Sequence, residues 1–372
     1  MNRRTFLSRG LYSMGLGACT AGWARRSAAQ EGEGVGLRGV QRFTETVDAL
    51  EQLPAEKRQW LSQNPEWLSP DELNARVPAI TKVELKNDTA KAEAPEQLRV
   101  ITWNIERGRA WRDCKKLIDA HPALQNPDVL LISEMDLGMQ RSANEHTTQR
   151  LAEALGMNYA YGVEFLELAR GDGDTYANWE QDNTWGYHGN AVLARFPLAD
   201  VRMLRFPGIE RWYGSGEHRL GGRNCICATI DWQGTTTTLM STHFESGFGN
   251  RSARVEEAQM VVDEIEAHAP GQPVIFGGDL NDLPSSPVLK TLVEGGLNIE
   301  DPNLLDTPTI VLERDGRVVL AGGHIDYLAT RGVATVKHEH SPAVVLAAWP
   351  NHADGALLSD HAAVAADLRL PG

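Results

Sequence analysis

Six short segments of this chain carry side chains of the kinds that bind metal ions and phosphate groups, and each lies at an expected strand end. Carboxylate and amide oxygens are the ligands that Mg²⁺ prefers, and one or two carboxylates suffice to hold it. A histidine beside a carboxylate is the usual means of moving a proton near neutral pH. The segments are Val100–Glu106, Leu131–Glu134, Ser241–His243, Gly277–Asn281, His324–Tyr327 and Ser359–His361.

Glu134 follows an apolar run, Val129–Ser133, that predicts a buried strand. This position puts a carboxylate at the carboxyl end of the strand, where it could hold a cation. Taken alone, Glu134 would more often be an ordinary solvated acid at a strand end. Asn104 gives a weaker signal, because asparagine is common after strands as a turn residue.

Gly277–Asn281 is the strongest local signal in the chain. Glycine has no side chain, so the backbone can approach a phosphate closely there. Asp279 and Asn281 point to one side if the segment is extended. The alternative is a Gly-Asp turn after a strand, and the preceding Pro273–Phe276 run fits either interpretation.

Three further residues could move protons or contact a phosphate: His243, Asp326 and His361. A carboxylate beside an imidazole raises its basicity and fixes its tautomer. Any one histidine by itself would more often be a core or edge residue bonded to backbone. Their significance therefore depends on the whole series of segments.

Taken together and in this order, the six segments resemble the endonuclease/exonuclease/phosphatase superfamily, whose fold is that of deoxyribonuclease I. The resemblance covers the chain from about Leu98 to Leu370. It implies an α/β four-layer sandwich, in which two mixed β-sheets pack face to face with helices outside. It also implies metal-dependent hydrolysis of a phosphoester, with Mg²⁺ as the expected cofactor and Mn²⁺ or Ca²⁺ as alternatives.

The resemblance also implies roles for particular residues. Glu134 matches the principal metal ligand and Asn104 sits beside it, with Asp360 near the metal or near Asp279. Asp279 would position or deprotonate the attacking water, and Asn281 would support the transition-state phosphate. The remaining matched residues are His243, which would donate to the phosphate, and the pair Asp326 and His361. Whether His361 or Asp279 is the base stays open.

Three residues are expected to contact the substrate: Asn190, Arg107 and Arg251. Asn190 lies in the segment His188–Pro197, which matches a further part of the family pattern. Arg107 belongs to a group of basic residues after Asn104. Arg251 begins a predicted helix, where a solvated helix face is an equally good interpretation.

The remaining pattern of the chain agrees with alternating strands and helices. Apolar runs predict strands at 98–103, 128–133, 190–194, 224–231, 236–241, 274–277, 325–329 and 362–368. Helical spacing predicts helices at 115–121, 147–155 and 252–268. Cys225 and Cys227 share a strand face and are interpreted as core residues rather than as a disulfide or zinc site.

The sequence predicts three parts: a leader at 1–29, a helical or irregular extension and linker at 30–97, and a catalytic domain at 98–372. The leader carries Arg3 and Arg4 before a short apolar stretch and has no acidic residue, which indicates export by the twin-arginine machinery. Cleavage near Ala29 is the first expectation, and lipid attachment at Cys19 is the alternative. The protein is therefore expected in the periplasm or outside the cell.

The formal net charge is −14, which argues against non-specific binding of nucleic acid, since that requires a basic face. A phosphodiesterase or phosphomonoesterase acting on a small molecule or lipid is favoured slightly. A secreted nuclease and a sphingomyelinase-like lipid phosphodiesterase remain alternatives, and a binding protein without catalysis is the least favoured. No obligate protein partner is evident beyond the export machinery.

Overall fold

The computed structural model describes residues 40–64, 69–89, 94–168, 183–207, 218–247, 250–299 and 304–371. These residues belong to one compact unit, Val40–Gly372. The predicted leader, with Arg3, Arg4 and Cys19, lies outside the described residues, as does residue range 169–182. None of the described helices is both long enough and apolar enough to cross a membrane.

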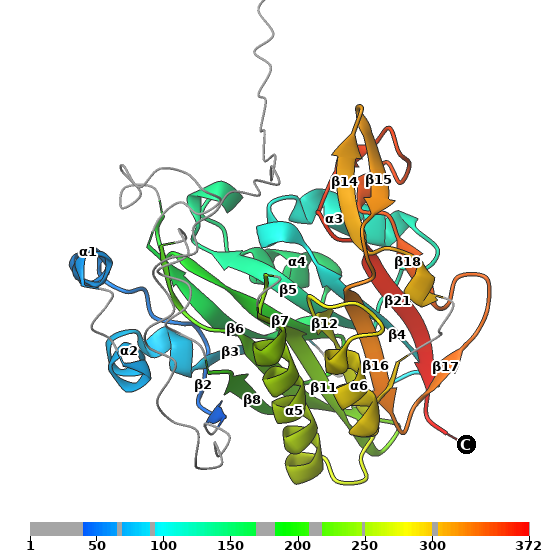
Figure 1. Ribbon diagram of the computed structural model, residues 1–372, viewed down its shortest axis with the longest axis horizontal. Helices are drawn as coiled ribbons and strands as arrows, with labels where there is room; N and C mark the ends of the chain where they lie inside the picture. Colours follow the sequence, from blue (N-terminus) through cyan, green and yellow to red (C-terminus); the bar gives the residue numbers. More distant parts are fainter. Residues whose placement is uncertain are drawn as a thin grey trace, which may run out of the picture. The chain divides into compact units, whose positions relative to one another are not determined.

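Two mixed β-sheets form the framework (Figure 1). The first sheet has the strand order β1 (Gln41–Phe43), β8 (Ala199–Arg205), β10 (Asn224–Trp232), β11 (Thr235–His243), β12 (Val274–Asp279), β16 (Asp326–Arg331) and β13 (Asn298–Ile299). The second has the order β17 (Ala334–Val336), β21 (Ala363–Arg369), β4 (Gln97–Asn104), β5 (Val129–Leu137), β7 (Tyr187–Ala194), β6 (Asn158–Glu167), β3 (Val83–Lys86) and β2 (Thr46–Val47). Two short strands join its margins, β18 (Ala343–Val345) beside β21 and β9 (Arg219–Gly221) beside β6.

Alternation along the strands produces the layers of the core. In β5, Val129 and Leu131 belong to a buried cluster that also contains Leu239 and Ile275 of the first sheet. The intervening Leu130 instead joins a cluster with residues of two outer helices. Because successive side chains point to opposite faces, a strand that is apolar at every position can fill the space between the sheets and the space beneath the helices.

Helices cover the outer face of each sheet. The second sheet packs against α3 (Trp111–Ala120) and α4 (Thr147–Leu155), through Leu117 and Leu151. The first sheet packs against α5 (Arg251–His268) and α6 (Pro287–Glu294), through Val261 and Leu289. This confirms the expected four-layer sandwich, and each of the predicted strands and helices is present with small shifts at its ends.

The predicted boundary near residue 97 does not separate two structural units. Strand β1 pairs with β8 of the first sheet, and β3 pairs with β6 of the second. Arg205, which is buried, donates to the carbonyl of Ile80. The residues from Val40 onward are therefore part of the sandwich. These strands have only two to four residues, which is too short to give a strand pattern in the sequence.

The extension is helical in part, as the sequence indicated, with α1 (Ala55–Gln63) and α2 (Pro70–Arg76). Helix α2 begins at a capping box, in which the Ser69 side chain accepts from the backbone N–H of Glu72 while the Glu72 carboxylate accepts from Ser69. Leu73 and Val77 are fully buried. This segment therefore contributes apolar side chains to the core beneath the second sheet.

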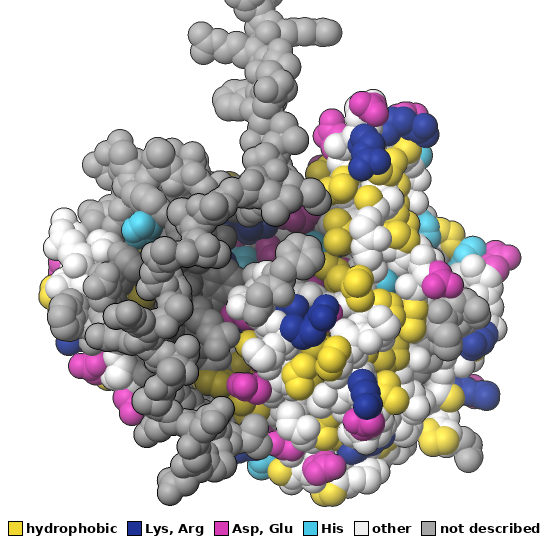
Figure 2. Space-filling model, in the orientation of Figure 1, with side chains coloured by type: hydrophobic (Ala, Val, Ile, Leu, Met, Phe, Trp, Pro, Cys, Tyr) yellow, Lys and Arg dark blue, Asp and Glu magenta, His cyan; other side chains and the backbone are white. Residues whose placement is uncertain are grey.

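Two small hairpins lie outside the main sheets: β14 (Ile310–Arg314) with β15 (Arg317–Ala321), and β19 (Ala348–Trp349) with β20 (Ala356–Leu357). Hydrophobic side chains run along the β14–β15 hairpin and charged ones gather at its tip (Figure 2). The hairpin is fixed at its base, because Val311 N–H donates to the Asp360 carbonyl and Ala362 N–H donates to that of Thr309. It therefore holds the chain on both sides of His361.

Candidate active site

Three of the predicted residues are neighbours because of strand register alone. His243 ends β11 and lies beside Asp279, which ends β12. Asp279 in turn lies opposite Asp326, the first residue of the antiparallel β16. A loop of any length between these strands would leave that arrangement unchanged, since the ladder hydrogen bonds fix it.

The second sheet brings Asn104 and Glu134 to the same edge of the sandwich. Asn104 is the last residue of β4 and pairs with Ser133 of the parallel strand β5. The register of β5 shifts between Ile132 and Met135, and Glu134 has a φ of 59° within this bulge. Bulges of this kind re-aim a side chain next to active sites. Here the bulge directs the Glu134 carboxylate toward Asn104.

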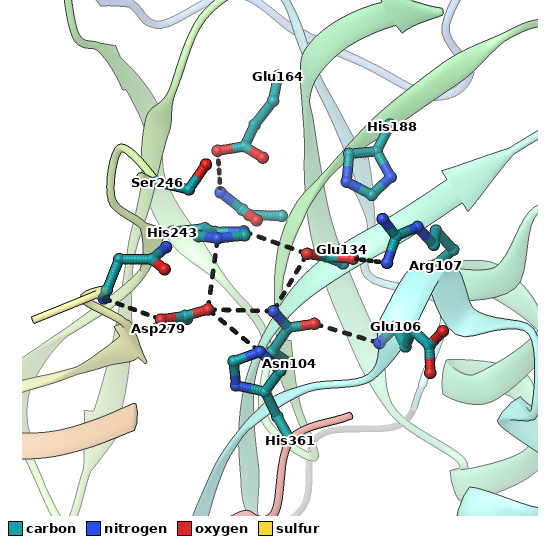
Figure 3. Close-up of polar contacts among 12 residues, drawn as sticks. Asn104, Glu106, Arg107, Glu134, Glu164, His188, His243, Ser246, Asp279 and His361 are labelled. Carbon is teal, nitrogen blue, oxygen red and sulfur yellow. Dashed lines mark hydrogen bonds and ion pairs between the residues drawn. The ribbon is translucent and has the colours of Figure 1, made fainter. Parts of the chain in front are cut away.

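The Asn104 side chain bridges two carboxylates across the gap between the sheets (Figure 3). Its Nδ2 atom lies 3.2 Å from Glu134 Oε1 and 3.2 Å from Asp279 Oδ2. Its Oδ1 atom accepts from the backbone N–H of Glu106. Asn104 thus positions Glu134 and Asp279 in this structure, and its amide would have to turn over to offer an oxygen to a metal.

His243 lies between the same two carboxylates. Its Nδ1 atom is 3.9 Å from Glu134 Oε1, and its Nε2 atom is 3.4 Å from Asp279 Oδ2. Burial, reinforced by the charge of Arg223, lowers the pKa of His243 well below its usual value. A neutral imidazole that can donate one hydrogen bond is therefore expected at this position.

His361 approaches Asp279 from the segment before β21. Its Nδ1 atom lies 2.9 Å from Asp326 Oδ2, and its Nε2 atom lies 3.5 Å from Asp279 Oδ2. Burial lowers the pKa of His361, but Asp326 and Asp279 outweigh burial and raise it well above its usual value. Burial raises the pKa of Asp279 to about 7, even though His361 acts in the opposite direction.

Asn281 and Asp360 are also found at this edge. Asn281 has a φ of 52°, its N–H donates to Asp279 Oδ1, and its Nδ2 atom donates to the carbonyl of Phe244. Asp360 Oδ1 lies 4.0 Å from His361 Nε2. Burial raises the pKa of Asp360, and Glu134 adds to that effect.

The two glycines before Asp279 allow close packing within and between the sheets, and their predicted phosphate contact stays a prediction. A side chain at Gly277 would meet the Thr102 and Leu131 side chains at about 3 Å, between the sheets. At Gly278, where φ is 153°, a Cβ atom would overlap the carbonyl of Thr242 on the neighbouring strand. Both glycines are buried within β12, so they let this strand pack closely against the facing sheet and against the neighbouring strand β11.

The three expected substrate contacts lie in different surroundings. Arg107 reaches the site and its Nη1 atom lies 3.0 Å from Glu134 Oε2. Asn190 is fully buried, and its Nδ2 atom donates to Glu164 and Asn224, which leaves the amide oxygen as its remaining polar atom. Arg251 is mostly exposed and pairs with Asp282 at 3.0 Å, so it supports the loop that follows Asn281.

His188 and Asp136 were not singled out from the sequence, although the segment containing His188 was. They are directly opposite on β7 and β5, and His188 Nδ1 lies 2.8 Å from Asp136 Oδ1. A signal was available, because residues two apart on a strand share a face. If Asn190 faces the site, His188 must lie on the same side.

The oxygen atoms at this edge fit a hard divalent cation. Among the described residues, Asp326 Oδ1, Asp360 Oδ1 and Glu134 Oε2 are buried without a hydrogen-bond partner, although Arg107 is ion-paired to the last of these. Buried charged oxygens without partners are costly unless a cation compensates them. Asp279, Asp326 and His361 also place one potential ligand atom each within 4.8 Å of one another. The imidazole there is already hydrogen-bonded to Asp326, so we favour the oxygen set around Glu134.

The sequence places a group of basic residues after Asn104, and a nuclease would need such residues in a basic cleft. Three of them, Arg112, Lys115 and Lys116, instead pair with acids on or near α3. On the face shown in Figure 2, basic and acidic side chains are interspersed. Aromatic side chains near the site segments could stack on bases if they were exposed. Phe244 is fully buried, and Trp212, Tyr213 and Phe248 fall outside the described residues, as does the basic Arg211.

The chain is similar to several known proteins. Residues 101–361 match the model of the Endonuclease/Exonuclease/phosphatase family. Human (Homo sapiens) tyrosyl-DNA phosphodiesterase 2 is 23% identical over 210 residues, which are 54% of this chain and 46% of that protein. The chain thus spans less than half the length of this relative.

Solved structures of low sequence identity share the fold. An endonuclease/exonuclease/phosphatase from Beutenbergia cavernae DSM 12333 has a TM-score of 0.53 at 22% identity and covers 75% of this chain and 72% of its own. The human Nocturnin catalytic domain with bound sulfate has a TM-score of 0.50 at 18% identity, and the match covers 76% of this chain and 97% of the Nocturnin chain. With the family model matching most of its length and the fold shared, this chain belongs to the endonuclease/exonuclease/phosphatase family.

Proposed function

We propose that the protein is an exported, metal-dependent phosphodiesterase that hydrolyses its substrate by in-line attack of water. The observation that carries the proposal is the convergence, from six separate segments, of His243, Asp279, Asp326 and His361 with Asn104 and Glu134. The family membership and the phosphodiesterase name of the human relative support the reaction class.

Mg²⁺ would be held by Glu134 and Asp360, with Asn104 beside them, and would neutralise charge on the phosphate. Asp279 is suited to accept the proton of the attacking water, because its pKa of about 7 keeps part of it unprotonated at neutral pH. His361, whose pKa is raised by Asp326 and Asp279 despite burial, supplies positive charge beside Asp279. These directions favour Asp279 over His361 as the base.

His243 and Asn281 complete the contacts to the phosphate. The neutral His243 offers one N–H group, and Asn281 Nδ2 has a second N–H beyond the one that it gives to Phe244. Donors fixed before the substrate arrives stabilise the charge that develops on phosphoryl oxygens. Asn190 could donate only if its amide turned over and its contact with Glu164 changed.

An ester-hydrolysis assay tests the proposal. Mature protein and His361→Ala are assayed on bis-p-nitrophenyl phosphate and on p-nitrophenyl phosphate, with EDTA or with added Mg²⁺ or Mn²⁺. Metal-dependent turnover of the diester that is lost in the variant is the expected result. Preference for the monoester would make the protein a phosphomonoesterase, and salt-sensitive cleavage of DNA exceeding that of the simple diester would make it a nuclease. The absence of turnover on every ester would count against catalysis.

The export part of the proposal depends on Arg3 and Arg4 in the acid-free leader. Cell fractionation of the native host tests it, with the Arg3→Lys, Arg4→Lys double variant as the control. Processed wild-type protein outside the cytoplasm and retained variant are expected. A full-length wild-type product in the cytoplasm would contradict export, and a labelled lipid on Cys19 would replace cleavage near Ala29.

A further inference from the structure

His188 lies on the side of Glu134 away from Asp279 (Figure 3), and it forms a second aspartate–histidine pair with Asp136. His188 Nδ1 lies 2.8 Å from Asp136 Oδ1, a geometry close to that of His361 and Asp326 at 2.9 Å. Both histidines are at least nine-tenths buried. The proposed reaction as described so far uses only one of the two pairs.

Asp136 is well suited to fix the His188 ring. It is fully buried and accepts two hydrogen bonds from Arg141, to Oδ1 and to Oδ2, at 2.8 Å each. These two hydrogen bonds come from a guanidinium cation, so they favour the ionised carboxylate. An ionised Asp136 requires His188 Nδ1 to carry a proton and donate it. Arg141 Nη2 also lies 3.2 Å from His188 Nδ1, and the other nitrogen, Nε2, has no hydrogen-bond partner among the described residues.

The position of His188 is opposite to that of the water-activating group. Asn104 Nδ2 lies 3.2 Å from both Asp279 and Glu134, and His243 lies between the same two carboxylates. In the proposed reaction Asp279 accepts a proton from the attacking water and Glu134 holds the cation, so the phosphate would lie beside these two acids. Figure 3 shows His188 beside Arg107, beyond Glu134 as seen from Asp279.

In-line displacement at phosphorus places the attacking and leaving oxygens on opposite sides. If the water is held at Asp279, the leaving oxygen would point away from Asp279, toward the side where Figure 3 shows Glu134, Arg107 and His188. The leaving group of an unactivated ester is an alkoxide, a strong base that needs a proton as the bond breaks.

We propose that His188 is the proton donor to the leaving group, held in position by Asp136, and this inference rests on the proposed phosphodiesterase activity. In the step, the bond between phosphorus and the leaving oxygen breaks while the bond from water oxygen to phosphorus forms. The leaving oxygen takes the Nε2 proton of the His188 imidazolium, and the attacking water gives its proton to Asp279. His188 ends as a neutral imidazole and is protonated again from solvent. Because such a donor matters only for a strongly basic leaving oxygen, the expected substrates are phosphodiesters with unactivated alcohol leaving groups.

The way in which the hydrolysis rate depends on the basicity of the leaving group separates this role from a structural one. Rates are measured for the mature protein and for its His188→Asn variant on a series of methyl aryl phosphates whose phenolate leaving groups are increasingly basic. Asparagine can still donate to Asp136 through its amide, so the fold is preserved, but it cannot deliver a proton. The expected loss is under about tenfold for the nitrophenyl ester and about 10²–10⁴-fold for the most basic leaving group.

Matched variants define the alternatives. Asp136→Asn should also make the rate fall more steeply as the leaving group becomes more basic, because the His188 ring loses its fixed tautomer. His146→Gln alters another histidine–carboxylate pair, His146 with Glu84 at 2.9 Å. Its rates should depend on the basicity of the leaving group just as those of the wild type do. If His188→Asn and His188→Gln both kept the wild-type dependence of rate on leaving-group basicity, the inference would be wrong, whereas the proposed phosphodiesterase activity would stand. Wild type without metal-dependent turnover on any ester would instead remove the proposed function and this inference with it.

Discussion

His361 and Asp326 are joined by a 2.9 Å contact between Nδ1 and Oδ2, although 35 residues separate them in the chain. Asp326 is fully buried and lies opposite Asp279 in the sheet, while His361 is held by the base of the β14–β15 hairpin. The pair therefore links a rigid sheet position to a loop position.

Replacing Asp326 by Asn should lower the pKa of His361. The sign follows from charge, because the carboxylate stabilises the imidazolium and the amide does not. Titration of the His361 ring signals by NMR measures the effect, with His146→Gln as a control that leaves those signals in place. An unchanged His361 pKa would mean that Asp279 alone determines it.

Glu134→Gln should weaken binding of the divalent cation by at least about 100-fold, the upper end of what loss of a supporting partner costs. The amide keeps the size of the side chain but removes its charge and frees Arg107 from its ion pair. Calorimetric titration of the metal-free protein with Mn²⁺ or Mg²⁺ measures this directly. If Asp326→Asn weakens binding and Glu134→Gln does not, the cation belongs to the Asp279, Asp326 and His361 cluster instead.

For the nitrophenyl diester, whose leaving group needs little help from a proton donor, kcat/KM should rise with pH through about 7, as Asp279 loses its proton. Burial favours the neutral acid, so below this pH the group is protonated and cannot accept a proton from water. In His361→Gln the residual activity should rise at a higher pH, since the positive charge that lowers the pKa of Asp279 is gone. A profile that falls over the same range would identify a required acid in place of the base.

Glu257 should make the protein less stable as the pH rises. Burial raises its pKa from 4.5 in the unfolded chain to about 8 in the fold. The folded state therefore binds the proton more tightly, so this contribution is complete below about 4.5 and is lost as the pH approaches 8. Thermal unfolding across this range should show a Tm that falls more for wild type than for Glu257→Gln. Parallel curves would show that Glu257 is ionised throughout.

A chain that begins at Gln97 should fail to fold as a stable domain, in contrast to the boundary that the sequence suggested. It lacks β1 and β3 and the buried Leu73, Val77 and Val83. It also leaves the Arg205 guanidinium without the carbonyl of Ile80. Circular dichroism and thermal unfolding compare it with a chain that begins at Val40. A cooperative transition at the same temperature for both would contradict the integrated role of residues 40–96.

Apolar alternation along the strands accounts for how much of the fold could be predicted. Val129–Ser133 is apolar at nearly every position because both of its faces are covered, and such runs stand out in any sequence. Strands β1 and β3 could not be found in the same way. They are short and depend on pairing with β8 and β6, which is a property of the assembled sheets.

Residue types and their order determined which side chains could do chemistry: Glu134, His243, Asp279, Asp326 and His361. Their resemblance to a family pattern was enough to identify them, because each lies at the end of a strand and the apolar runs of the strands can be recognised in the sequence. The sequence also indicated that Arg107, Asn190 and Arg251 would contact the substrate. Only the structure showed that Asn190 gives its amide protons to Glu164 and Asn224, and that Arg251 pairs with Asp282.

Tertiary structure alone decided the relations between segments. The bulge that turns Glu134 toward Asn104, the register that sets Asp279 beside Asp326, and the pairing of His188 with Asp136 all depend on neighbouring strands. The physical reason is that a strand fixes only the direction of its own side chains, whereas distances between side chains of different strands come from hydrogen-bonded register and sheet packing. A sequence thus names the candidates for the site, and the packed sheets decide which of them meet.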